Sequence, residues 1–183
     1  MQTIRELFHI LISRDATHRR GPRLPCYLFT YHAYGSWMPD HRRGYVHRGD
    51  GIRPSDKNMA TLYRANLKQD VVRFDSATQR HLIDGTLEAC RCQGVRCHFI
   101  ATEATHVHVL VSWKSDRTWE IVRRQIRRNV TLRLDDAYKR QQWFSKSPSR
   151  KRVEDRKHFD YLVGAYLPKH SGWKWCEERG LFR

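Results

Sequence analysis

The segment 105–111 (THVHVLV) constrains the fold more than any other part of the chain, because its residues alternate in character. Successive side chains of a β-strand point to opposite faces of the sheet. Val107 and Val109 then share a face that we expect to lie in the core. His106 and His108 share the other face, about 7 Å apart along the strand. The segment therefore predicts a half-buried strand that presents two imidazoles on one side.

The rest of the pattern predicts a small α+β fold. Strands are expected over residues 24–34, 95–102 and 106–113, and helices over residues 75–94, 116–134 and 154–167. Residues 35–58 predict a long loop, and residues 135–152 an irregular connector. This order favours an antiparallel sheet with helices packed on one face. We expect residues 1–22 to form a basic N-terminal arm and residues 23–183 a single domain.

The net charge points to a polyanionic partner. The chain has 35 Lys and Arg against 19 Asp and Glu, a formal charge of +16. Residues 117–156 alone carry 13 basic and 5 acidic residues, or +8 of that excess. A solvated helix face is the ordinary interpretation of such a run, but paired arginines at helical spacing favour contact with nucleic-acid phosphates. The candidate contacts are Arg123, Arg124, Arg127, Arg128, Arg150, Lys151 and Arg152.

Other classes of protein are disfavoured. No apolar run approaches twenty residues, so a membrane span is not expected, and no secretory signal is apparent. Five cysteines without a disulfide-like spacing favour a reducing, cytoplasmic environment. Cys90, Cys92 and Cys97 with His98 could suggest zinc, but this spacing is not that of a familiar zinc site, and buried thiols are expected instead.

Two further residues could join the histidine pair. Two imidazoles on one strand face can chelate a divalent cation, although solvated strands also carry histidines. Tyr166 precedes His170 by four residues, so one helical turn would place a phenol beside a third imidazole. The alternative is that Tyr166 packs in the core and His170 is a cation at a helix C-terminus. Pro168 between them predicts that the helix bends or ends there. His32 could join the site if its strand lies alongside.

This combination resembles a known family. The strand His106-Val107-His108, a basic helix, and a later helix with Tyr166 and His170 are similar to the single-tyrosine HUH transposases, and among them to the REP-associated tyrosine transposases. Residues 31–37 (YHAYGSW) and 170–175 (HSGWKW) support the resemblance. It covers residues 24–175 of the chain.

The resemblance implies a ferredoxin-like, HUH endonuclease-like fold and a catalytic role for the candidate residues. His106, His108 and His170 would hold Mg²⁺ or Mn²⁺. Tyr166 would attack a scissile phosphate of single-stranded DNA, leaving a 5′-phosphotyrosine and a free 3′-OH that can later be rejoined. The family implies hairpin DNA as the substrate and a homodimer as the active form. Tyr161 is the reserve nucleophile, although Ala165 four residues later cannot ligate a metal.

Two other functions remain open. A non-catalytic protein that binds single-stranded or structured nucleic acid would need no histidine site, and a zinc-dependent structural module would use the cysteines. In the catalytic interpretation, the basic residues of the segment 117–156 would form a continuous positive surface that guides DNA phosphates to the metal and to Tyr166. Four aromatic residues could stack on unpaired bases or pack in the core: Trp143, Phe144, Trp173 and Trp175.

Overall fold

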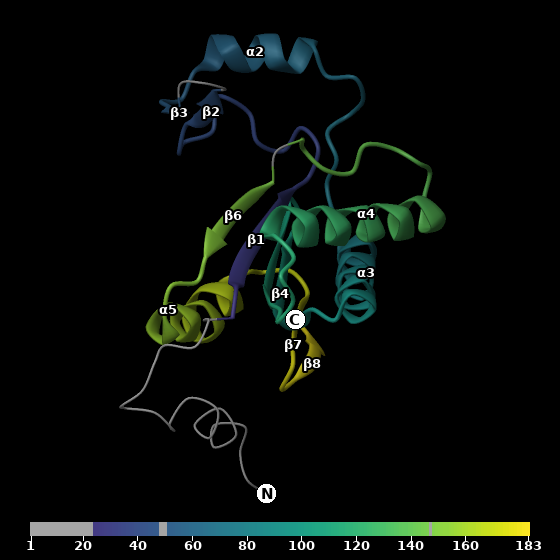
Figure 1. Ribbon diagram of the computed structural model, residues 1–183. Helices are drawn as coiled ribbons and strands as arrows, with labels where there is room; N and C mark the ends of the chain where they lie inside the picture. Colours follow the sequence, from purple (N-terminus) through teal and green to yellow (C-terminus); the bar gives the residue numbers. More distant parts are fainter. Residues whose placement is uncertain (1–23, 48–50, 147) are drawn as a thin grey trace, which may run out of the picture.

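A six-stranded antiparallel sheet forms the centre of the protein (Figure 1). The structure is a computed structural model that describes residues 24–47, 51–146 and 148–183; the expected arm over residues 1–22 lies outside them. The strand order is β6-β1-β5-β4-β7-β8. The strands are β1 Cys26–His32, β4 Arg96–Glu103, β5 His106–Ser112, β6 Ser149–Arg152, β7 Lys174–Cys176 and β8 Gly180–Phe182. The predicted α+β fold with an antiparallel sheet is confirmed.

Two long helices cover one face of this sheet (Figure 1). Helix α3, Ser76–Gln93, begins where the Asp75 side chain accepts a hydrogen bond from the backbone of Thr78, and ends at Gly94 in the left-handed conformation. Helix α4, Trp119–Ala137, buries one apolar stripe against the sheet. The stripe consists of Val122, Ile126, Val130 and Leu134. Val107 and Val109 face these helices from β5, as predicted.

The opposite face is covered by the segment that follows β6. It consists of α5 Arg156–Tyr161, a π-helical turn η1 Leu162–Tyr166 and a 3₁₀ turn η2 Leu167–Lys169. Leu162 and Leu167 pack there against Leu28 and Leu110 of the sheet. The prediction of helices on one face therefore holds for α3 and α4, while the C-terminal helical segment lies on the other face. His106 and His108 lie on this second face.

A smaller unit lies beyond one end of the sheet (Figure 1). It contains the hairpin of β2 Tyr45–His47 and β3 Gly51–Arg53, followed by α2 Lys57–Ala65. The Asp56 side chain caps α2 by accepting from the backbone of Met59 at 2.9 Å. The predicted loop over residues 35–58 is thus wrong where the hairpin and the start of α2 form. Within the described residues, no helix combines the length and apolar character needed to cross a lipid bilayer.

Candidate active site

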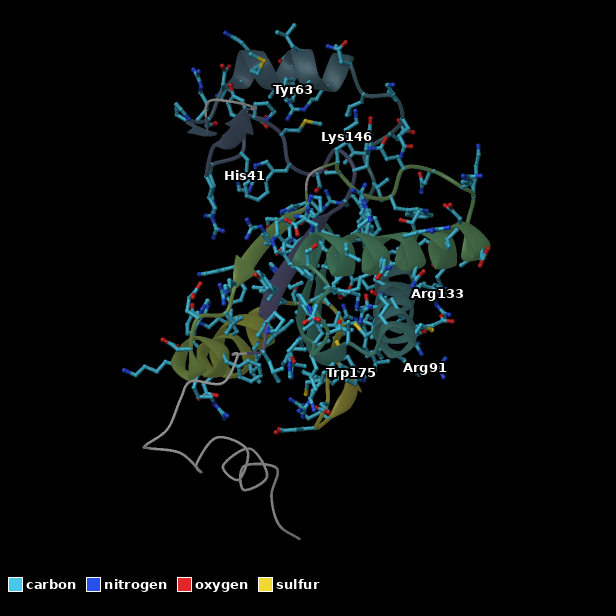
Figure 2. All side chains as sticks on the ribbon, in the orientation of Figure 1. His41, Tyr63, Arg91, Arg133, Lys146 and Trp175 are labelled. Carbon is cyan, nitrogen blue, oxygen red and sulfur yellow. The ribbon has the colours of Figure 1, made fainter. Side chains whose placement is uncertain are left out.

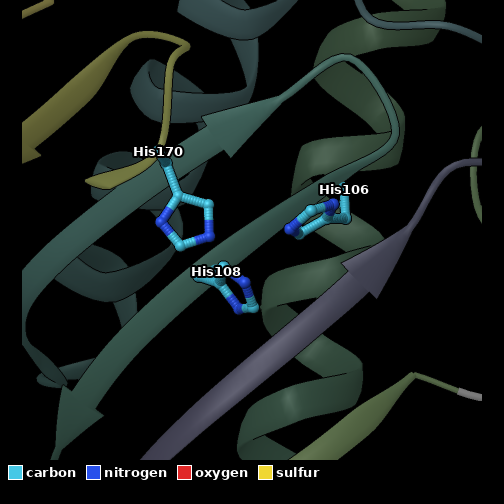
Figure 3. Close-up of side chains that lie close together, drawn as sticks. All are labelled: His106, His108 and His170. Carbon is cyan, nitrogen blue, oxygen red and sulfur yellow. The ribbon is translucent and has the colours of Figure 1, made fainter. Parts of the chain in front are cut away.

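Three histidines from two parts of the chain converge on one point (Figure 3). His106 and His108 come from β5, and His170 comes from the extended residue that follows η2. One nitrogen atom from each ring lies within 4.8 Å of the others. The structure therefore brings together the three residues that the sequence named as candidate metal ligands.

Hydrogen bonds to the chain orient all three rings. Nδ1 of His108 lies 2.7 Å from Oγ1 of Thr30, Nδ1 of His106 lies 3.0 Å from Oγ1 of Thr105, and Nδ1 of His170 lies 3.0 Å from the carbonyl oxygen of Leu167. A carbonyl oxygen can only accept, so Nδ1 of His170 carries the proton and its Nε2 keeps a free lone pair. Metal-binding histidines are commonly held in this way through the second ring nitrogen.

The site keeps two of its imidazoles neutral. Burial, together with the neighbouring His32 and His170, lowers the pKa of His106 to about 4. Burial, together with the neighbouring His106, His170 and His32, lowers the pKa of His108 to about 2. Neutral imidazole is the form that binds a metal ion. At neutral pH, His106 and His108 are therefore in the form that can bind a cation.

Tyr166 lies beside this group. Its hydroxyl oxygen is 3.3 Å from Nε2 of His108, and its ring centroid is 5.3 Å from that of His170. Burial raises the pKa of Tyr166, while the positive charge of Arg43 opposes the rise. The phenol and the imidazoles therefore share one site.

The placement of Tyr166 depends on an irregular helix. The backbone N–H of Leu167 donates to the carbonyl of Leu162, five residues earlier, which is the pattern of a π turn. Pro168 then lies in the 3₁₀ turn, and His170 is extended with φ −69° and ψ 138°. The predicted pairing of Tyr166 with His170 is present, but the prediction of one regular helical turn is wrong. The bend expected at Pro168 is found.

Tyr161 and His32 lie next to this group. Tyr161 is 55% exposed and stacks on Tyr166, with ring centroids 6.3 Å apart. The phenol that lies within hydrogen-bond distance of the histidines is that of Tyr166. The ring of His32 lies 5.6 Å from that of His106 but is not one of the three that converge.

Hydrogen bonds from Lys174 and to Glu103 fix the loop that carries His170. The buried Lys174 ammonium donates to the carbonyl of His170 at 2.7 Å and to that of Gly172 at 3.1 Å. The Glu103 carboxylate accepts from the backbone and the hydroxyl of Ser171 at 2.7 and 2.9 Å. A Cβ at Gly172 would collide with the backbone of β4. Sequence analysis did not single out Lys174 or Glu103, because Lys174 stood there only within the segment HSGWKW of residues 170–175.

Most of the predicted DNA-binding arginines lie on the other face of the sheet. The sheet separates α4 from the histidines, so the expected track of charge from this helix to the site is wrong. Arg123 donates to the carbonyl of Pro148 at 2.8 Å, and Arg127 to that of Phe144 at 3.3 Å. Arg124 and Arg128 are exposed.

The basic triplet on β6 is divided between the two faces. Arg150 pairs across the sheet with Phe29 and stacks over Trp119 of α4, with its guanidinium carbon 3.8 Å from the ring. Arg152 is two residues further along and faces the same way. Lys151 pairs with Leu28, whose side chain lies on the histidine face.

The cysteines and the four aromatic residues were the other candidates, and most of them pack in the core. Cys90 and Cys97 are buried and Cys92 is exposed, and among the described residues the only group suited to a metal is the histidine triad. The zinc interpretation of the cysteines therefore finds no geometry there. The four aromatic candidates all pack against the main core: Trp143 and Phe144 are buried, and Trp173 and Trp175 are partly buried.

Comparisons with known proteins find distant structural similarity and no relative in sequence. No family model and no curated protein matches the chain. A solved REP-associated tyrosine transposase bound to a REP hairpin is similar with a TM-score of 0.41 and 10% identity, covering 84% of this chain and 77% of that one. A candidate transposase from Deinococcus radiodurans R1 is similar with a TM-score of 0.43 and 11% identity, covering 86% of this chain and 100% of that one. Both are similar to this chain over most of its length.

Proposed function

We propose that the protein is a metal-dependent enzyme that cleaves and rejoins single-stranded DNA through Tyr166. The observation that carries this proposal is the Tyr166 hydroxyl, 3.3 Å from Nε2 of His108, beside three converging imidazoles. A phenol next to a metal site is suited to covalent phosphoryl transfer. The net charge of +16 supports a nucleic-acid substrate.

The residues divide the reaction between them. The Tyr166 oxygen would lose its proton to solvent and bond to phosphorus as the bond from phosphorus to the 3′ oxygen breaks. That oxygen would take up a proton, leaving a 5′-phosphotyrosine and a 3′ hydroxyl. The reverse attack by a 3′ hydroxyl would rejoin a strand and restore the phenol. Arg43, which lines a pocket together with His106, would attract the phosphate to this point.

His106, His108 and His170 would hold the cation. When bound, a divalent ion would polarise the scissile phosphate and offset its negative charge. Three imidazoles suit a transition-metal ion better than Mg²⁺, which prefers oxygen ligands. Of the two ions expected from the sequence, we therefore expect Mn²⁺ to bind more tightly. Specificity for hairpin DNA, the homodimer and a cytoplasmic location remain predictions.

The test uses end-labelled hairpin oligonucleotides with single-stranded flanks, incubated with the protein and Mn²⁺ or Mg²⁺. We expect a protein-linked DNA band on denaturing gels, lost on addition of a chelator and in Tyr166→Phe. Tyr161→Phe is the matched control, because it removes the stacked hydroxyl that lies outside the histidine group. A band lost in Tyr161→Phe but kept in Tyr166→Phe would refute the assignment. Binding without cleavage under all conditions would favour the non-catalytic alternative.

A further inference from the structure

A pocket with a mixed polar and apolar lining adjoins the histidine site at His106. It has a volume of about 220 Å³ and shares His106 with the metal-ligand group. The segment that follows β1 forms most of its wall, and His41 of that segment lies between the α2 unit and the end of the sheet (Figure 2). The lining residues are His32, Ser36, Trp37, His41, Arg42, Arg43, Thr105 and His106.

The aromatic wall of this pocket is held in place. The Trp37 indole donates to the carbonyl of Gly44 at 3.1 Å and stacks on the His41 ring with centroids 3.9 Å apart. Nδ1 of His41 accepts from the backbone N–H of Arg43 at 3.2 Å. Gly44 has φ +76°, and a Cβ there would collide with the Arg53 carbonyl oxygen, so the turn requires glycine. The wall is therefore built before any ligand arrives.

The charge of the pocket is positive. Arg42 and Arg43 are exposed, and no carboxylate lines the pocket. Arg43 lines the same pocket as His106, one of the three converging histidines. An anion bound by Arg43 would thus lie next to the reacting phosphate.

We propose that this pocket binds the nucleotide unit adjacent to the scissile phosphate of single-stranded DNA, with Arg43 on its phosphodiester and the Trp37–His41 pair beneath its base. The proposal rests on the proposed function and names a subsite of that same site. Flat aromatic walls with arginines are the usual means of holding unpaired bases. The volume of about 220 Å³ is below the roughly 300 Å³ of the smaller drug-sized sites, which is the scale of a single nucleobase.

Binding measured without cleavage tests the pocket. In the Tyr166→Phe background with Mn²⁺, fluorescence anisotropy compares a labelled oligothymidine strand with an abasic strand that has the same phosphates. We expect Arg43→Ala to weaken binding of both strands about tenfold and to reduce the salt slope by about 0.7. We expect Trp37→Ala to weaken binding of the thymidine strand about tenfold and to leave the abasic strand unchanged.

Two substitutions serve as controls. Arg91→Ala removes the same charge from the distant end of α3, and Tyr63→Ala removes an exposed ring from α2 (Figure 2). Both should change affinity less than about twofold, since non-contacting surface residues add little. Thermal melting confirms that each variant is folded, and His41→Ala replaces Trp37→Ala if the latter is not.

The outcomes separate the pocket from the proposed chemistry. If Arg43→Ala binds DNA as Arg91→Ala does, the pocket proposal is wrong. If Arg43→Ala weakens binding but neither aromatic substitution does, the site binds an anion only and the nucleotide assignment is overturned. If the expected pattern appears but the unsubstituted protein never cleaves DNA, the subsite stands and the proposed cleavage fails. If the protein cleaves DNA and the pattern is absent, the subsite alone fails.

Discussion

The two faces of the sheet use their polar residues in opposite ways. On the α4 face, Arg123 and Arg127 are tied to backbone carbonyls of the segment before β6. On the other face, the chain orients His106, His108 and His170 through Nδ1 and leaves the opposite nitrogens directed to a common point. On one face, two arginines hold neighbouring backbone in place, and on the other, three imidazoles converge in an arrangement that could hold a metal ion. Density of charge along a sequence therefore does not locate a reactive site.

The largest difference between the faces should appear in metal binding. We expect His108→Ala to weaken Mn²⁺ binding by more than the roughly 10–100-fold typical of losing an outer partner, since it removes a ligand. Cleavage should fall to background. Titration calorimetry with Mn²⁺ measures the first effect. Arg124→Ala, on the opposite face, should leave the Mn²⁺ affinity unchanged, and equal affinities in both variants would contradict the assigned ligand.

A smaller effect should follow from loosening the loop beneath His170. Lys174→Met keeps the length of the side chain but removes the two hydrogen bonds to the His170 and Gly172 carbonyls. We expect Mn²⁺ affinity to fall about tenfold, as for other outer partners, with a loss of about 1–3 kcal/mol in unfolding free energy. Lys151→Met is the control, because it removes an exposed lysine. Unchanged Mn²⁺ affinity with lowered stability would show that Lys174 does not position the ligand.

The exposed arginines of α4 and those that are hydrogen-bonded to backbone carbonyls should differ in their effects on DNA binding and on stability. Replacing the exposed Arg124 and Arg128 by alanine should reduce the salt slope of single-strand binding by about 1.4 if DNA contacts this face, with an unchanged melting temperature. Replacing Arg123 and Arg127 should instead lower the unfolding free energy by about 1–3 kcal/mol. Salt titrations and thermal melts measure both. An unchanged slope for the exposed pair would exclude this face from the DNA interface.

The smallest effect concerns pH and a histidine outside the triad. Burial lowers the pKa of His98 to about 4 from 6.5, and the charge of Arg96 contributes. Between these values the unfolded chain binds more protons, so stability falls as pH falls from 6.5 to about 4. His98→Gln should make the fall shallower by up to about 1.4 kcal/mol per pH unit. Urea unfolding at several pH values measures the slope, and an unchanged slope would contradict the shift.

The sequence predicted the parts of the fold that bury alternating or periodic apolar residues. The β5 alternation and the capped helix from Asp75 to Gly94 appear as expected. The edge strand β6 was missed, because all four of its residues are exposed and charged or polar and no apolar pattern marks it. Helix α2 was missed for a related reason, since it buries only Ala60.

The sequence predicted which three histidines lie together, but not the residues that surround them. His106 and His108 follow from strand period alone. Their relation to His170 depends on a π turn, which has no signature in residue types. Arg43 and Trp37 were hidden in a segment whose composition predicts only a loop. The stacked Trp37 and His41 pair is set by the turn at Gly44, and that close approach to Arg53 is visible only in three dimensions.

Because of the π turn, the position of the Tyr166 hydroxyl relative to His108 depends on the number of residues in the segment 162–166. A helix turns by about 100° per residue, so deletion of one residue among 162–165 would rotate Tyr166 away from His108 while the phenol and all three imidazoles stay in the chain. We expect such a deletion to reduce the proposed DNA cleavage as much as Tyr166→Phe does. The number of residues in this segment therefore matters to the site as much as their identity.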